Sequence, residues 1–164
     1  MEIRRVTSFD AARLRRVRLA ALADAPSAFG STYLAEADRS EAEWAVRADG
    51  AARGSDRATF FAQLDDDVVG LAGGYRTEPS SSVVELVSVW VAPHVRGRGV
   101  GALLVEAVVA WAIETNASSV ALWVTLGNTP AERLYASKGF VATGEVQPLP
   151  SDPTQDEFRM LLTL

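Results

Sequence analysis

The chain has 164 residues, of which 48% are apolar and 23% charged, and its formal net charge is -5. These proportions are those of a globular protein and exclude a disordered chain, and the length predicts one ordinary domain, residues 1–164, rather than two. The absence of cysteine excludes disulfides, thiolate metal ligands and thiol catalysis. The single histidine, His94, leaves no second imidazole for a multi-histidine metal site, so we expect no metal. The acidic balance argues against nucleic acid as a partner.

No segment of the sequence predicts membrane insertion or secretion. The N-terminal residues Met-Glu-Ile-Arg-Arg lack the apolar stretch of a signal peptide. The longest uncharged apolar run, near residues 107–113, is far shorter than the roughly 18 residues that a membrane-spanning helix needs. We therefore expect a soluble, cytoplasmic protein that has no membrane partner.

The first part of the chain predicts a short strand and then a helix. The strand is expected over residues 2–7, and Ser8 stands where the N-cap of a helix would stand. Apolar residues then follow at helical spacing from Leu14 to Leu22. The arginines around this apolar stripe are expected to form a solvated face: Arg13, Arg15, Arg16 and Arg18.

A second helix is expected after an irregular segment. Residues 25–39 are expected to be irregular because proline and glycine interrupt them. Ser40 and Glu43 then form a capping-box pattern, which predicts a helix that begins there and runs to about Arg53.

The remaining sequence alternates between strand and helix patterns. Strands are expected over residues 58–64, 68–75, 83–92, 120–126, 140–146 and 155–164, and helices from residue 100 to about 115 and from Pro130 to Gly139. Three aspartates, residues 65–67, join the first two of these strands as a hairpin. The strand, glycine-rich loop, helix and strand over residues 83–126 form a βαβ-like unit. The predicted fold class is therefore α/β or α+β, with a mixed sheet.

The most informative segment is the glycine-rich loop over residues 96–102, Arg-Gly-Arg-Gly-Val-Gly-Ala. Its glycines allow a tight turn in which successive backbone N–H groups point into one cavity. The helix that follows adds unpaired N–H groups and the positive end of its dipole. Arg96 and Arg98 add local positive charge. Together these features predict a phosphate-binding site.

Two common phosphate motifs do not fit this loop. The P-loop requires Lys and Ser or Thr after its second glycine, whereas Ala102 and Leu103 follow Gly101 here. The dinucleotide-binding fingerprint requires G-x-G-x-x-G and an acidic residue at the end of a second strand, whereas this loop reads G-x-G-x-G and Glu114 lies inside the predicted helix. A pyrophosphate loop for acyl-coenzyme A and a purely structural glycine turn remain as interpretations.

Two ordered motifs resemble those of the GNAT superfamily of N-acetyltransferases. The run Arg96-x-x-Gly99-x-Gly101 matches the Arg/Gln-x-x-Gly-x-Gly/Ala signature, and Asn128-x-x-Ala131-x-x-x-Tyr135-x-x-x-Gly139-Phe140 resembles the second motif of the family at the expected distance. The resemblance is good over about residues 58–147. It implies a mixed, mostly antiparallel central sheet flanked by helices, with a splayed strand pair and an acetyl-CoA-binding core over about residues 83–140.

The resemblance also implies which residues bind the acyl donor. Val91, with Val89 and Trp90, would pair with the pantetheine arm through the backbone. The residues of the loop would bind the pyrophosphate: Arg96, Gly97, Arg98, Gly99, Val100, Gly101 and Ala102. Asn128 would bind near the pantetheine or cap the short helix, and both roles are compatible. Phe29 and Tyr33, in the irregular segment, are candidates for lining the acceptor pocket by analogy with the fold alone.

The catalytic roles implied by the resemblance fall on Tyr135 and Glu85. Tyr135 would act as the general acid, donating a hydrogen bond or a proton to the departing thiolate; the reference pKa of a phenol, about 10, exceeds that of a thiol, about 8.5. Glu85, six residues before Val91, would act as the general base that takes the proton of an ammonium group. The structural alternatives are a packed tyrosine and an edge or salt-bridged glutamate, and we rank Tyr135 above Glu85.

Regular alternation along the strand over residues 83–92 predicts which side chains share a face. One face would carry Glu85, Val87, Val89 and Val91, and the other Leu86, Ser88 and Trp90.

These features predict an acyl-CoA-dependent N-acetyltransferase. A primary amine, of a small molecule or a peptide, would attack acetyl-CoA directly in a ternary complex, since no cysteine is present as a covalent carrier. The alternative is a catalytically silent acyl-CoA-binding regulatory module, which would keep the same loop. Paired sheets in relatives make a homodimer compatible with the resemblance.

The charge distribution adds a hint about the acceptor. Residues 58–164 carry six basic and twelve acidic side chains, so the phosphate site lies in the more acidic part of the chain. Local amides and arginines, rather than net charge, must therefore bind the cofactor. The negative field favours a cationic amine.

Overall fold

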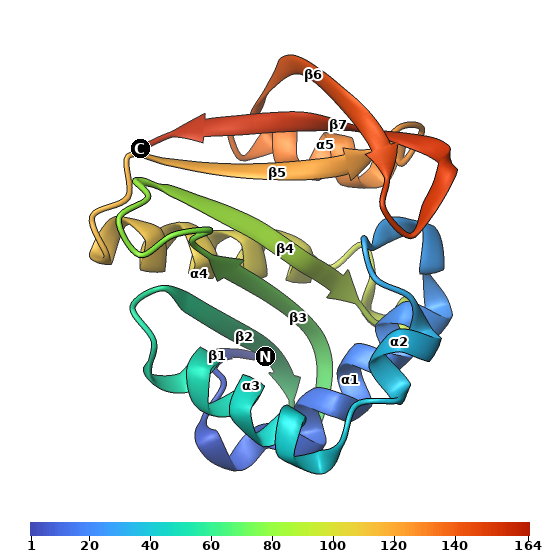
Figure 1. Ribbon diagram of the computed structural model, residues 1–164, viewed down its shortest axis with the longest axis vertical. Helices are drawn as coiled ribbons and strands as arrows, with labels where there is room; N and C mark the ends of the chain where they lie inside the picture. The colour runs from blue at the N-terminus through green and yellow to red at the C-terminus, as the bar shows by residue number, and fades with distance from the viewer.

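The computed structural model describes residues 1–164 and contains a seven-stranded sheet with helices on both faces (Figure 1). The strands are β1 (Glu2–Arg5), β2 (Arg57–Leu64), β3 (Asp67–Tyr75), β4 (Val83–Val91), β5 (Ser119–Thr125), β6 (Val141–Leu149) and β7 (Asp152–Thr163). Their order in the sheet is β1-β2-β3-β4-β5-β7-β6. Every neighbouring pair is antiparallel except β4 and β5. The predicted fold class, a mixed and mostly antiparallel sheet flanked by helices, is confirmed.

The helices divide between the two faces of the sheet (Figure 1). They are α1 (Ala11–Asp24), α2 (Tyr33–Ala37), α3 (Glu41–Arg53), α4 (Val100–Glu114) and α5 (Thr129–Ser137), with 3-10 turns η1 (Ser8–Asp10), η2 (Pro26–Ala28) and η3 (Pro93–Val95). Helices α1 and α3 cover one face, and α4 covers the other. None of the helices has both the length and the apolar character needed to cross a membrane.

Capping residues explain where the first helices begin. The predicted capping box of α3 is confirmed, because the Glu43 amide donates to Ser40 Oγ at 3.3 Å and the Ser40 amide donates to Glu43 Oε2 at 2.8 Å. The prediction that Ser8 is an N-cap is wrong. Thr7 and Asp10 form a capping box around η1, and Ser8 lies inside that turn. The segment over residues 25–39, predicted to be irregular, contains η2 and α2.

The predicted solvated face of α1 needs one correction. Arg15 and Arg16 are exposed, but only 7% of Arg18 is exposed. Its guanidinium lies over the ring of Phe29 at 4.8 Å, and its Nη1 donates to Ser88 Oγ at 3.0 Å. Arg18 lies one helical turn after Leu14 and therefore faces the sheet with the apolar residues of the stripe.

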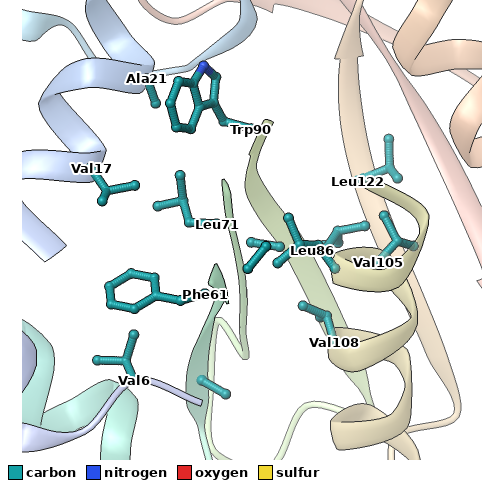
Figure 2. Close-up of a cluster of buried hydrophobic side chains, with 14 of the residues drawn as sticks. Val6, Val17, Ala21, Phe61, Leu71, Leu86, Trp90, Val105, Val108 and Leu122 are labelled. Atoms are coloured by element: carbon teal, nitrogen blue, oxygen red, sulfur yellow. The ribbon is translucent and has the colours of Figure 1, made fainter. Parts of the chain in front are cut away.

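Strand β4 reverses its two faces at a β-bulge. Ser88 has a φ of 59°, and the register with β3 shifts beside it. Figure 2 shows Leu86 pointing toward α4, whereas Trp90 points toward α1. The prediction that Leu86 and Trp90 share a face is therefore wrong. Glu85 precedes the bulge and Val91 follows it, so these two side chains, also predicted to share a face, lie on opposite sides of the sheet.

The parallel pair β4–β5 opens along its length. The two strands pair only over residues 83–85 and 119–121. Beyond these residues the strands diverge toward their carboxyl ends, as Figure 1 shows. This divergence is the splayed strand pair that the resemblance implied, and it leaves backbone groups of β4 without a neighbouring strand.

Candidate functional site

A cavity of about 590 Å³ lies where β4 and β5 diverge. It is enclosed by the end of β4, the glycine-rich loop, the first turn of α4, and α5, with η2 nearby. The predicted cofactor residues that line it are Val89, Trp90, Val91, Arg96, Gly97, Gly99, Val100, Gly101, Ala102, Asn128 and Tyr135. Arg98, also predicted, is exposed and does not line the cavity. We call this space the splay cavity.

The glycine-rich loop presents backbone N–H groups at one end of the splay cavity. Gly97 and Gly99 have φ values of 74° and 80°, a conformation that residues with a Cβ rarely adopt. The Leu103 amide donates to Gly99 O at 3.2 Å as the helix begins, so the N–H groups just before it have no helical partner. This arrangement suits an anion such as a pyrophosphate.

Gly101 has a different reason to be glycine. A Cβ at this position would lie 3.1 Å from Leu134 Cδ2 and 3.7 Å from Val91 Cγ2. The absent side chain therefore lets α4 approach α5 and β4 closely at the base of the splay cavity.

Arg96 connects the loop to β4 and α1. Its Nε donates to Val91 O at 2.9 Å, and its guanidinium forms an ion pair with Asp24. Asp24 Oδ2 also accepts from Trp90 Nε1 at 2.8 Å. Asp24 thus positions two residues of the site, and the sequence analysis missed it because it lies 72 positions before Arg96, without a motif of its own.

The backbone of Val91 is available on the open side of β4. The Ala92 amide donates to Val69 O at 2.8 Å, toward β3. Because successive residues of a strand direct their backbone groups to alternate sides, the N–H and C=O of Val91 point away from β3 and into the splay. The bond from Arg96 to Val91 O agrees with this direction.

Asn128 caps α5 and lines the splay cavity. Its Oδ1 accepts from the Ala131 amide at 3.4 Å, so the predicted N-cap is confirmed. The same side chain belongs to the cavity wall.

Tyr135 lies in α5, buried against the splay cavity. Only 8% of it is exposed, and its ring meets Phe140 edge-on, with 5.9 Å between the ring centroids. Burial raises the pKa of the phenol above its ordinary value of about 10. The hydroxyl therefore stays protonated at neutral pH and is able to donate a hydrogen bond. Of the two residues proposed for the acceptor pocket, Phe29 lines the same cavity, and Tyr33 is exposed outside it.

Glu85 does not reach the splay cavity. Arg159 on β7 binds its carboxylate through two nitrogens, with Nη2 2.6 Å from Oε1 and Nη1 3.4 Å from Oε2. The Arg159 guanidinium also lies 5.2 Å from the ring centroid of Trp123. The structure therefore does not bring Glu85 and Tyr135 together, because the bulge in β4 directs Glu85 to the other face.

A mixed sheet that splays at its parallel strand pair, with a glycine-rich loop and a helix N-terminus at the opening, defines the class of acyl-CoA-dependent acetyltransferases. Comparison with known proteins agrees with this class. Residues 19–140 match the model of the Acetyltransferase (GNAT) family. The chain belongs to the GNAT family of acetyltransferases, so the family predicted from the two motifs is confirmed.

Two curated relatives match part of the chain. It is 33% identical over 83 residues to an uncharacterized N-acetyltransferase of Archaeoglobus fulgidus, covering 48% of the chain and 56% of that protein. It is 35% identical over 88 residues to N-acetylaspartate synthetase of Danio rerio, covering 54% of the chain and 31% of that protein. The matched region thus spans about half of the archaeal relative and a third of the fish relative.

Solved structures resemble the fold over nearly the whole chain. Ribosomal-protein-alanine N-acetyltransferase from Brucella melitensis has a TM-score of 0.77 at 22% identity and covers 100% of both chains. Spermidine N-acetyltransferase from Vibrio cholerae, solved with CoA and spermine, has a TM-score of 0.77 at 17% identity and covers 99% of this chain and 94% of its own. At these identities the likeness concerns the fold.

Proposed function

We propose that this chain transfers an acetyl group from acetyl-CoA to a primary amine of a small molecule or peptide, by direct attack in a ternary complex. The observation that carries the proposal is the splay cavity, which has free loop amides at one end and the protonated Tyr135 phenol in its wall. The family to which the chain belongs supports the same reaction.

The acyl donor would bind to backbone N–H groups that have no hydrogen-bond partner within the protein. The amides of residues 97–102 would bind the pyrophosphate at the start of α4, where the helix dipole favours negative charge. The Val91 N–H would pair with the pantetheine arm along the open side of β4. Arg96 would hold the Val91 carbonyl and keep this part of the strand rigid. Arg98, outside the cavity, would contribute charge only.

Tyr135 would act on the leaving group. When the amine attacks the thioester carbon, the C–S bond breaks and negative charge develops on sulfur. A phenol whose pKa is raised by burial remains a hydrogen-bond donor but gives up its proton with difficulty. We therefore assign Tyr135 the stabilisation of the thiolate by a hydrogen bond, with proton transfer in concert with loss of a proton from nitrogen.

Glu85, the candidate general base, ranks below Tyr135 as a catalytic residue. Its carboxylate is held by Arg159 on the face of β4 opposite to the Val91 side chain. In a base role it would have to accept the proton through water. We therefore propose that the main role of Glu85 is to hold Arg159 in place.

One observation favours the second candidate function, a silent acyl-CoA-binding module. The residues that line the splay cavity include no carboxylate and no histidine. A protein that only binds acyl-CoA would have the same loop and the same strand opening.

Calorimetry and a turnover assay separate these functions. We expect acetyl-CoA to bind and free CoA to be released only after a suitable amine is added. Binding without release across amino acids, peptides, polyamines and aminoglycosides would favour the silent module. Absence of CoA binding at near-millimolar concentration would refute both functions.

A further inference from the structure

A second cavity, of about 140 Å³, lies on the opposite face of β4, between the sheet and helices α1 and α3. Its polar lining consists of Arg18, Trp44, Arg47, Arg57, Thr59, Tyr75 and Ser88, with apolar residues and glycines completing the wall. Three of these side chains are arginines, and no acidic side chain lines the space. We call it the arginine cavity.

Two buried hydrogen-bond donors around this cavity have no acceptor. Arg18 Nε and Trp44 Nε1 are both buried without a partner, and their residues are 7% and 1% exposed. Buried donors are nearly always satisfied, since leaving one unpaired is unfavourable. Two such donors in the lining of one small cavity point to an acceptor group that binds there.

The charge of the arginine cavity is only partly balanced within the protein. The buried carboxylate of Glu36 lies 3.7 Å from Arg18 Nη2 and 3.1 Å from Arg39 Nε, and it also pairs with Arg47. Arg39 also pairs with Glu43 at 3.7 Å, so two carboxylates serve three guanidinium groups, which leaves an excess of one positive charge. Arg57 has only an exposed contact with Asp56, at 3.6 Å.

Burial of Arg18 makes its charge costly for the free protein, whereas the side chains of Arg47 and Arg57 are 36% and 53% exposed. Desolvation lowers the pKa of Arg18 from its ordinary value, even with Glu36 beside it. Glu85, a further carboxylate on this side of the sheet, is held by Arg159. An anionic group that entered the cavity would compensate Arg18 and Arg47.

The arginine cavity and the splay cavity lie on either side of β4 at its bulge. Ser88 lines the arginine cavity, and the next residue, Val89, lines the splay cavity. Arg18 stacks on Phe29, and Phe29 belongs to the wall of the splay cavity. Ser88 and Val91 are three residues apart, a distance of about 10 Å along a strand. An acceptor with several bonds between its carboxylate and its amine can therefore extend from one cavity toward the other.

We propose that the arginine cavity binds the carboxylate of the acceptor, so that the acceptor is an amino acid or a short peptide with a free carboxylate. This inference rests on the proposed function. The carboxylate oxygens accept from the donors of Arg18, Trp44 and Arg47, and the amine extends past the bulge toward the thioester. The local arginines thus outweigh the negative field of the chain, which by itself favours a purely cationic amine.

Matched acceptors test the carboxylate directly. Initial rates of CoA release are compared for lysine and cadaverine, and for dialanine and its C-terminal amide. We expect kcat/KM to be at least about tenfold higher for the member with the carboxylate, as a hydrogen-bonded charge would give. Equal values within each pair, or a preference for the member without the carboxylate, would overturn the inference.

Two variants that each remove one ion pair with Glu36 test the cavity itself. Arg47 and Arg39 both bind Glu36, but only Arg47 lines the arginine cavity. Arg47→Met is expected to raise the acceptor KM about tenfold and to leave the KM for acetyl-CoA unchanged, whereas Arg39→Met changes neither. Arg57→Met, which leaves the ion pairs of Glu36 intact, is also expected to raise the acceptor KM. Equal effects of the Arg39 and Arg47 variants would contradict the assignment.

A binding measurement separates this inference from the proposed function. The N–H resonances of Arg18 Nε and Trp44 Nε1 are followed by ¹H–¹⁵N NMR during titration with N-acetyl-leucine and with its amide, in the presence of CoA. We expect both resonances to shift with the acid and to stay in place with the amide. No shift with the acid up to tens of millimolar overturns carboxylate binding, whether or not acetyl transfer occurs. Loss of all CoA binding or release, with the shifts retained, would instead refute the proposed function.

Discussion

The two cavities beside β4 are built from different parts of the chain. The splay cavity takes its polar groups chiefly from backbone amides and from residues close together in sequence, between Val89 and Tyr135. The arginine cavity takes its polar groups from side chains on α1, α3, β2, β3 and β4. The first arrangement suits a cofactor shared by a whole family, and the second suits a ligand that varies from one member to another.

The bulge at Ser88 separates the two cavities. Before it, Leu86 packs toward α4; after it, Trp90 packs toward α1 (Figure 2). A regular strand would have put Ser88 and Trp90 on the α4 side with Leu86. The bulge instead directs Ser88 to Arg18 and Trp90 to Asp24, so the same strand serves both sites.

The largest effect is expected from Tyr135→Phe. The variant removes the hydrogen bond to the departing thiolate but keeps the buried ring and its edge-on contact with Phe140. We expect kcat to fall about 100-fold, the lower range for a general acid, while the affinity for acetyl-CoA is unchanged. Steady-state kinetics and calorimetry measure the two quantities. Wild-type kcat in this variant would remove Tyr135 from the mechanism.

An intermediate effect is expected from Gly99→Ala, with Gly144→Ala as its control. Both glycines have a positive φ, 80° and 92°, and nothing lies within 4 Å of either Cβ position. Each substitution should therefore reduce the free energy of unfolding by about 1 kcal/mol through backbone strain. Only Gly99→Ala should also weaken acetyl-CoA binding, by about tenfold, because the strained loop turns its amides out of the splay cavity.

Chemical denaturation and calorimetry compare these two variants. Equal acetyl-CoA affinity in both would show that the loop amides do not bind the pyrophosphate.

The smallest effect is expected from Glu85→Gln, with Arg159→Met as its control. Both variants break the same ion pair, but only the first removes the carboxylate. If Glu85 chiefly holds Arg159, both should lower kcat by no more than about fivefold, whereas loss of a general base costs about 100-fold or more. Arg159→Met should lower the melting temperature more, because it also removes the contacts of Arg159 with Glu145 and Trp123. A large loss of kcat in Glu85→Gln alone would restore Glu85 as the base.

Most residues that line the splay cavity could be picked out from the sequence because their signals are local. The positive φ of Gly97 and Gly99 is a requirement that only glycine meets easily, so the loop is visible as a spacing of glycines. Asn128 and Pro130 likewise mark the start of α5 with their own chemistry. These residues determine a local conformation regardless of what packs against them.

The arginine cavity could not be predicted in the same way. Arg18 lies in the same helix as the exposed Arg15 and Arg16, and its spacing from Leu14 places it on the face toward the sheet. Its partners Ser88 and Glu36, which make its burial possible, are brought to it only by the tertiary structure. No glycine marks the bulge at Ser88 in the sequence. The assumption of regular alternation therefore wrongly placed Glu85 on the same face as Val91, and Leu86 on the same face as Trp90.

The sequence by itself determined the order of the strands and of the helices other than α2, the glycine-rich loop and the family, because these depend on periodicity and on conformations particular to single residue types. Only the tertiary structure decided which arginines lose contact with water, which carboxylate Arg159 neutralises, and where β4 changes face. Those outcomes depend on contacts between residues far apart in the sequence, such as Arg18 and Ser88, and a local sequence pattern contains no information about such contacts.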